Sequence, residues 1–261
     1  MIYLAFLFFT LIILYIAFYQ WQYFMVFSPV FYREEELCDS CTLLSVIAKD
    51  EVELEGAVYK PEHNATSTLL VFVGRSHDAV GLINKLAQTY TQTRIVSFNY
   101  RSYGRSGGKI SEENLKSDAL EIASLVQKNY GNFSILGYSL GSSIAAYVAS
   151  KLDTKKLFLV GAFDSMASLA KTKFVVKGFV PYINLSNVFR YKFRTFEYVQ
   201  NINTPSYLFV SKDDDITYID NARELKKNVK NLAKYIELEG LDHKELLWDK
   251  TVTTTINKEL L

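Results

Sequence analysis

The sequence predicts an α/β fold, with helices on both faces of a mostly parallel sheet, preceded by one transmembrane helix. From residue 42 onward, short β-rich runs alternate with segments of helical period. Met1 to Tyr19 is almost wholly apolar, and a Gly-x-Ser-x-Gly motif follows one of the β-rich runs. A chain of 261 residues with 49% hydrophobic content can bury one large core. We therefore expect an anchor over residues 1–28 and one globular domain over residues 29–261.

The N-terminal segment has the length and composition of a membrane-spanning helix. No charged side chain occurs from Met1 to Phe31, and about 20 apolar residues suffice to cross the hydrocarbon core. Tyr19, Trp21 and Tyr23 follow the apolar stretch, as is typical of a membrane interface. A cleaved signal peptide needs a positive n-region and a small-residue cleavage site, and neither is visible here. A buried core helix is usually shorter and amphipathic.

The residues just after the anchor say little about its orientation. Arg33 is followed by three glutamates, so the positive-inside rule favours a cytoplasmic domain only weakly.

Cys38 and Cys41 are the only two cysteines. They form either a structural disulfide or a reduced pair, because no thioredoxin-like context surrounds them. Two further ligands that a zinc site requires are not found nearby.

The β-rich runs and helical segments can be placed in order along the chain. Residues 42–48 and 52–59 are predicted to pair as a hairpin, with Asp50 and Glu51 in the turn. Further strands are expected at residues 69–73, 94–100, 133–136, 157–160, 207–210 and 234–238. Helices are expected at residues 80–90, 111–130 and 142–152. Ser111, followed by two glutamates, suits the start of the second helix.

Residues 163–203 form a longer segment that is rich in aromatic side chains. Two interpretations fit it: a hydrophobic cover over the functional site, or a helix pair that buries its aromatic residues on the sheet. Pro181 is expected to bend or end a helix there.

The motif Gly137-Tyr138-Ser139-Leu140-Gly141 lies between a predicted strand and a predicted helix. This context is that of a sharp turn that holds a serine in a strained conformation with its hydroxyl exposed. Gly137 and Gly141 are needed because a Cβ at either position would clash with neighbouring backbone. The motif predicts Ser139 as a nucleophile, and a plain Gly-rich turn is the alternative.

A serine nucleophile requires a base and a carboxylate that orients the base. Of the three histidines, His63 and His77 precede the motif and only His243 comes late, in a loop after the strand expected at 234–238. For the acid, Asp213, Asp214 and Asp215 all follow the strand expected at 207–210. We favour Asp214, because Ile216 can then turn back into the core. The chain order Ser, Asp, His supports the set jointly.

The oxyanion that forms during acyl transfer must meet preorganised N–H donors. One donor is expected to be Leu140, the residue after the nucleophile. The second is expected from the loop after the third strand, where Gly74 lets the backbone turn and Arg75 can direct its N–H inward.

A nucleic-acid partner is not expected, because 29 basic residues against 28 acidic ones leave a net charge of only +1.

Together these motifs resemble the membrane-anchored, single-domain α/β hydrolases related to the eukaryotic α/β-hydrolase-domain proteins, some of which are acyl-thioesterases. The resemblance runs from about residue 29 to residue 248. Besides the serine motif and the Asp214 and His243 loops, it rests on residues 98–108, 111–115 and 163–165. It implies that residues 29–261 form an α/β-hydrolase domain. It also implies hydrolysis of an ester or thioester through a covalent acyl-enzyme, without a metal or organic cofactor.

Three positions depart from the family pattern. The family usually has His-Gly-Asn where this chain has Val73-Gly74-Arg75, Asp where it has Asn99, and Gly where it has Ser211. A cation beside the oxyanion loop can bind an acidic substrate, or it can mark altered or lost activity. The leading hypothesis is a serine hydrolase that acts on a small-molecule or lipid acyl substrate at the membrane. A catalytically silent interaction module and a serine peptidase are the alternatives, since fold does not fix function.

Overall fold

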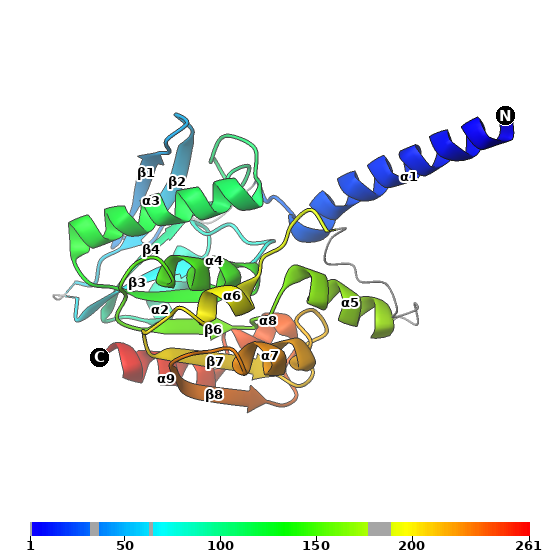
Figure 1. The fold of residues 1–261 in the computed structure, drawn as a ribbon. Coiled ribbons are helices and arrows are strands. Elements are labelled where there is room, and N and C mark those ends of the chain that lie inside the picture. The colour runs from blue at the N-terminus through cyan, green and yellow to red at the C-terminus, as the bar shows by residue number, and fades with distance from the viewer. Residues whose placement is uncertain (1, 32–36, 63–64, 177–188) are drawn as a thin grey trace.

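The centre of the structure is a sheet in the order β1-β2-β4-β3-β5-β6-β7-β8 (Figure 1). The computed structural model describes residues 2–31, 37–62, 65–176 and 189–261. β1 pairs with β2, and β2 with β4, in antiparallel fashion, whereas all later pairs are parallel. The strands are β1 (Cys41–Ile47), β2 (Glu53–Tyr59), β3 (Ser67–Phe72), β4 (Thr93–Phe98), β5 (Ser134–Tyr138), β6 (Leu157–Val160), β7 (Ser206–Ser211) and β8 (Leu232–Leu238).

Helices cover both faces of this sheet. Figure 1 shows α3 and α4 on one side of it and α2 and α9 on the other. Asn257 in α9 donates to the carbonyl of Thr89 at the end of α2 over 2.9 Å, which ties these two helices together. The helices that follow the strands are α2 (Ile83–Thr89), α3 (Glu112–Tyr130), α4 (Leu140–Ala149), α5 (Met166–Val176), α6 (Thr195–Val199), α7 (Ile219–Lys226), α8 (His243–Leu246) and α9 (Lys250–Leu260).

The central strands are buried on both faces. β5, β6 and β7 have no exposed residue, which explains why they read as continuous apolar runs rather than alternating ones. The predicted hairpin, the mostly parallel sheet and the three helices are confirmed, with ends that differ by a few residues. Ser111 caps α3 as predicted, because its hydroxyl accepts from the Asn114 amide at 3.1 Å.

The N-terminal helix α1 (Ile2–Val26) projects away from the sheet and its helices (Figure 1). It is long and apolar enough to cross a membrane, and none of its most apolar stretch is buried. Among the described residues, the last turns of α1 contact the rest of the chain, and Val26 and the following Phe27 are buried there. Cys38 and Cys41 are joined in a disulfide. Disulfides persist mainly in oxidising compartments. The weak charge asymmetry at Arg33, which lies outside the described residues, favours a cytoplasmic domain instead. The two observations therefore indicate opposite orientations of α1.

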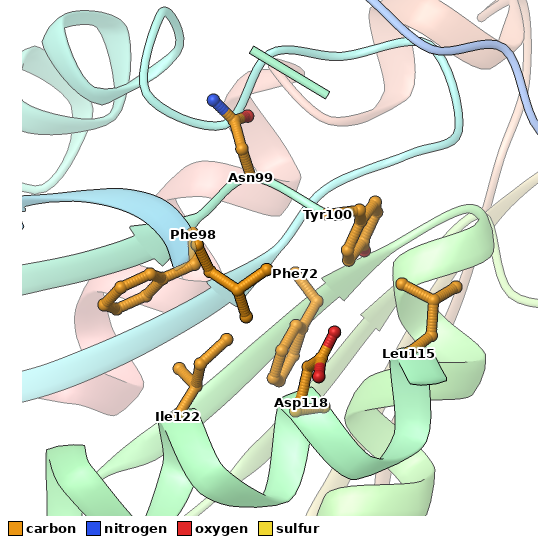
Figure 2. A pocket seen from close by; sticks show the side chains of 9 residues that line it. Phe72, Phe98, Asn99, Tyr100, Leu115, Asp118 and Ile122 are labelled. Carbon is orange, nitrogen blue, oxygen red and sulfur yellow. The ribbon is translucent and has the colours of Figure 1, made fainter. Parts of the chain in front are cut away.

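A buried polar cluster around Arg101 connects the antiparallel end of the sheet to α3. Arg101 is 4% exposed. Its Nε donates to Asp118 in α3 at 2.7 Å, and its Nη2 donates to Asp50 in the β1–β2 turn at 2.8 Å. Figure 2 shows Asp118 beside Phe72 and Ile122 at a small cavity between α3 and the sheet. Because Arg101 satisfies this carboxylate, the cavity belongs to the core.

Residues 163–203 combine features of both interpretations. α5 lines the same pocket as Ser139, and α6 contacts α4. The buried aromatic residues Phe189, Tyr191 and Phe193 pack on the end of α1 rather than only on the sheet, with the rings of Tyr191 and Phe27 4.8 Å apart. Pro181 and the bend predicted there lie outside the described residues.

Candidate active site

The predicted nucleophile lies on a sharp turn between β5 and α4. Ser139 is a non-glycine residue with a φ of 54°, a conformation that costs free energy and is often found at functional sites. A Cβ on Gly137 would come within 2.5 Å of the Gly141 carbonyl oxygen, and one on Gly141 within 2.1 Å of the Phe72 carbonyl oxygen. Both glycines are therefore required for the backbone to close this turn.

The structure brings the three side chains Ser139, Asp214 and His243 together. Nε2 of His243 lies 2.9 Å from Oγ of Ser139, and Nδ1 of His243 lies 2.7 Å from Oδ2 of Asp214. All three residues are at least nine-tenths buried. Of the neighbouring acids, Asp213 accepts from the Gly240 amide and Asp215 is exposed. Asp214 is thus the carboxylate that contacts the imidazole.

Asp214 is held in its charged form. Burial alone would raise the pKa of this carboxyl, but hydrogen bonds from His243 and Thr217 outweigh burial and hold its pKa below the ordinary value. Oδ1 accepts from the amides of Ile216 and Thr217 at 2.8 and 2.7 Å, and Oδ2 accepts from the Thr217 hydroxyl at 2.6 Å. With its oxygens fixed in this way, the carboxylate can orient the imidazole and stabilise a positive charge on it.

Three further residues around His243 were not predicted from the sequence. Tyr138 stacks on the imidazole with ring centroids 5.1 Å apart, and its hydroxyl donates to the His243 carbonyl at 2.7 Å. Thr217 lies 3.3 Å from Nδ1. The hydroxyl of Ser211 donates to the Leu241 carbonyl at 2.6 Å. This bond ties the strand that leads to Asp214 to the loop that carries His243, which accounts for a serine where the family usually has glycine.

The loop after β3, which carries Arg75, is held by hydrogen bonds with Asn99 and with Tyr103. Asn99 accepts from the Ala79 amide at 2.7 Å, and its amide group donates to the carboxylates of Asp78 and Glu55 at 2.8 and 2.9 Å. An aspartate at position 99 could not donate to two carboxylates, so asparagine suits this chain. The hydroxyl of Tyr103 donates to the Arg75 carbonyl at 2.5 Å.

The guanidinium group of Arg75 contacts the end of α1. Its Nη1 donates to the carbonyl of Met25, in the last turn of α1. A cation at the C-terminal end of a helix satisfies a free carbonyl and complements the helix dipole. Arg75 therefore links the loop after β3 to the end of the N-terminal helix.

Ser139 lies between two pockets of different character. One is a cavity of about 90 Å³ with mostly apolar walls from α1, α4 and α5, and the cationic residues Arg75 and Lys173 also line it. The other is more polar and is lined by His77, Asp215, Asp242 and Lys244. Burial lowers the pKa of His77, which favours its neutral form. Within the described residues, no group of three or more His, Cys, Asp or Glu side chains could hold a metal ion.

Sequence comparison finds uncharacterised relatives of the chain. No family model matches the chain. It is 25% identical to an uncharacterised protein of Acanthamoeba polyphaga mimivirus over 71% of this chain and 70% of that protein. It is 33% identical to an uncharacterised membrane protein of Saccharomyces cerevisiae over 41% of this chain and 40% of that one.

Solved structures cover more of the chain. The Pyrococcus furiosus esterase Pf2001 superposes with a TM-score of 0.68 at 16% identity, over 89% of this chain and 98% of the esterase. An alpha-beta hydrolase from Vibrio vulnificus gives a TM-score of 0.69 at 18% identity, over 85% of this chain and 82% of that one. The predicted α/β-hydrolase fold is thereby confirmed.

Proposed function

We propose that the protein is a serine hydrolase that cleaves an acyl ester or thioester at a membrane surface, with Ser139 as nucleophile. Esterases among the structures of the same fold support a hydrolase. The observation that carries the proposal is the hydrogen-bonded series Ser139, His243 and Asp214 on a strained turn. The candidate membrane helix α1, whose last turn borders the pocket at Ser139, supports action at a membrane.

In the proposed reaction, Oγ of Ser139 forms a bond to the substrate carbonyl carbon while its proton passes to Nε2 of His243. The C–O or C–S bond of the substrate then breaks, and the imidazolium returns its proton to the leaving alcohol or thiol. Water attacks the acyl-enzyme with His243 again as base, which releases a carboxylic acid and regenerates the serine. Asp214 holds the imidazole in the required tautomer through both halves.

The negative charge on the carbonyl oxygen is assigned to two backbone donors. Leu140 is the first residue of α4, and the first amides of a helix have no partner within the helix. Its N–H can therefore receive the oxyanion together with the partial positive charge of the helix N-terminus. The second donor is the backbone N–H of Arg75.

The alternative of a catalytically silent interaction module depends mainly on Arg75. The bond from its guanidinium to Met25 gives this side chain a role in holding α1, and the series of hydrogen bonds to Ser139 is complete. The peptidase alternative uses the same three residues. The mostly apolar pocket beside Ser139 favours an acyl chain over a peptide.

A fluorophosphonate probe tests the proposal. The full-length protein in detergent or vesicles is expected to be labelled, and Ser139→Ala is expected to lose the label completely. Ser143→Ala is the matched control, since Oγ of Ser143 is buried without a hydrogen-bond partner among the described residues and should be dispensable. A folded wild-type protein that takes no label would refute the assignment of Ser139 as nucleophile.

A further inference from the structure

The apolar pocket at Ser139 has two walls from distant parts of the chain. Met166, Leu169 and Ala170 of α5 form one wall. Met25 and Val26, at the end of α1, form the facing wall. Ser139 and Leu140 line the same pocket, as do Arg75 and Lys173. An acyl group bound to Ser139 can therefore extend its hydrocarbon chain between α5 and the end of α1.

The α1 wall is fixed in place by contacts with the hydrolase fold. Oε1 of Gln22 accepts from the Arg190 amide at 2.7 Å, and the ring of Phe27 packs on Tyr191 at 4.8 Å. The Ser28 amide donates to the Tyr103 hydroxyl at 3.0 Å, and that same hydroxyl donates to the Arg75 carbonyl. The Tyr103 hydroxyl therefore connects the backbone of Arg75, the proposed oxyanion donor, to Ser28, which follows the end of α1.

The length of α1 places this wall at the membrane boundary. Its 25 residues at about 1.5 Å each give a helix of about 37 Å, which is longer than a hydrocarbon core of about 30 Å. Tyr19, Trp21 and Tyr23 mark the interface, and Met25 comes within two turns after them. Phe24, in the same last turns, is 69% exposed and is not among the residues that line the pocket. The apolar surface of α1 thus leads from the bilayer to the pocket.

We infer that the last turn of α1 is part of the substrate site, with Met25 as a specificity-determining residue for a long acyl chain drawn from the bilayer that holds α1. This inference rests on the proposed serine hydrolase function and deepens it. The substrate class is an ester or thioester of a long-chain fatty acid. Its acyl chain leaves the bilayer along α1 and enters between α1 and α5 while its carbonyl reaches Ser139.

Labelling rates with two fluorophosphonates, one ethyl and one hexadecyl, test the role of Met25 in the full-length protein. Met25→Trp fills the pocket from the α1 side and Ala170→Phe fills it from the α5 side. Each is expected to lower the ratio of hexadecyl to ethyl labelling by about tenfold or more, since each excluded methylene is worth a measurable share of binding. Phe24→Trp adds similar bulk on the lipid side and should leave the ratio within about twofold.

The source of the chain is tested by placing the hexadecyl probe either in the same vesicles as the protein or in separate ones. Labelling is expected to be fast only in shared vesicles. Equal rates in the two arrangements would overturn delivery from the bilayer. An unchanged ratio in Met25→Trp and Ala170→Phe, or an equal drop in Phe24→Trp, would overturn the pocket assignment. A wild-type protein that neither probe labels would instead refute the serine hydrolase proposal itself.

Discussion

The site has two sides that are held by different kinds of contact: the nucleophile side, around the proposed nucleophile Ser139, and the anchor side, at the end of the candidate membrane helix α1. On the nucleophile side, β5 lies between β3 and β6 in continuous ladders, and every residue of α4 except Tyr147 is buried. On the anchor side, the contacts of the end of α1 with the described residues include aromatic ring contacts and hydrogen bonds such as that between Gln22 and Arg190, 168 positions apart. The geometry of the proposed catalytic residues thus rests on the sheet, whereas the pocket wall at α1 rests on contacts that can open separately.

The largest expected effect lies on the sheet side, at Asp214. Asp214→Asn removes the negative charge and the acceptor that fix the imidazole, so kcat/KM on an acyl ester should fall by about 10³ to 10⁴-fold. Because the pKa of Asp214 is held below its ordinary value, the wild-type carboxylate stays charged throughout the neutral and mildly acidic range. Asp220→Asn, in α7 and exposed, is the control and should change kcat/KM by less than about threefold. Equal losses in both variants would contradict the assignment of Asp214.

The turn that presents Ser139 should respond next most strongly, through folding. Gly141→Ala places a Cβ within 2.1 Å of the Phe72 carbonyl oxygen, so the free energy of unfolding should fall by about 3 kcal/mol or more. Gly107→Ala, whose Cβ would have its nearest neighbour at 3.6 Å, should cost little. Denaturant titration of the two variants measures both effects. A stable, active Gly141→Ala protein would show that the close contact between β3 and α4 can relax.

A substitution on the anchor side should act locally. Phe27 is 1% exposed, and Phe27→Ala should weaken the docking of α1 by about 2 to 3 kcal/mol, a factor of about 100 in hydrogen exchange at residues 189–193. Unfolding of the sheet should change much less. Phe24→Ala, at an exposed position, is the matched control. If Phe27→Ala lowered the stability of the whole fold by the same amount, both sides would belong to one cooperative unit and the contrast between them would fail.

The same contrast explains what could be predicted from the sequence. Gly137, Ser139 and Gly141 form a local motif whose strand and helix context is visible in one short segment. His243 could be predicted because it is the only one of three histidines that follows this motif. Thr217 and Ser211 are ordinary loop residues, and their contacts with Asp214 and the His243 loop arise only once β7 and β8 lie side by side. Met25 lies in the last turn of an apolar helix, and nothing local distinguishes it from its neighbours. Its place in the pocket depends on residues more than 100 positions away.

The smallest expected effect concerns the exposed rim of the sheet, at Glu237 in β8. Nε and Nη2 of Arg223 donate to its two carboxylate oxygens at 2.9 and 2.8 Å, which lowers the pKa of Glu237 to about 2. Because the folded pKa lies below the ordinary value of 4.5, the pair stabilises the fold fully above that pH and is lost as pH falls toward 2. The pair is largely solvated, so Glu237→Gln should cost at most about 1 kcal/mol near pH 7.

Urea titrations across this acidic range measure the effect, with Glu224→Gln, which breaks an exposed pair with Lys227, as the control. The wild-type and Glu237→Gln stabilities should converge as pH approaches the folded pKa of Glu237. A loss at neutral pH as large as that of Gly141→Ala would mean that rim ion pairs, and not the buried ladders, hold this edge. In that case the sheet side would depend on a few isolated contacts, as the end of α1 does, and the two sides of the site would no longer differ in kind.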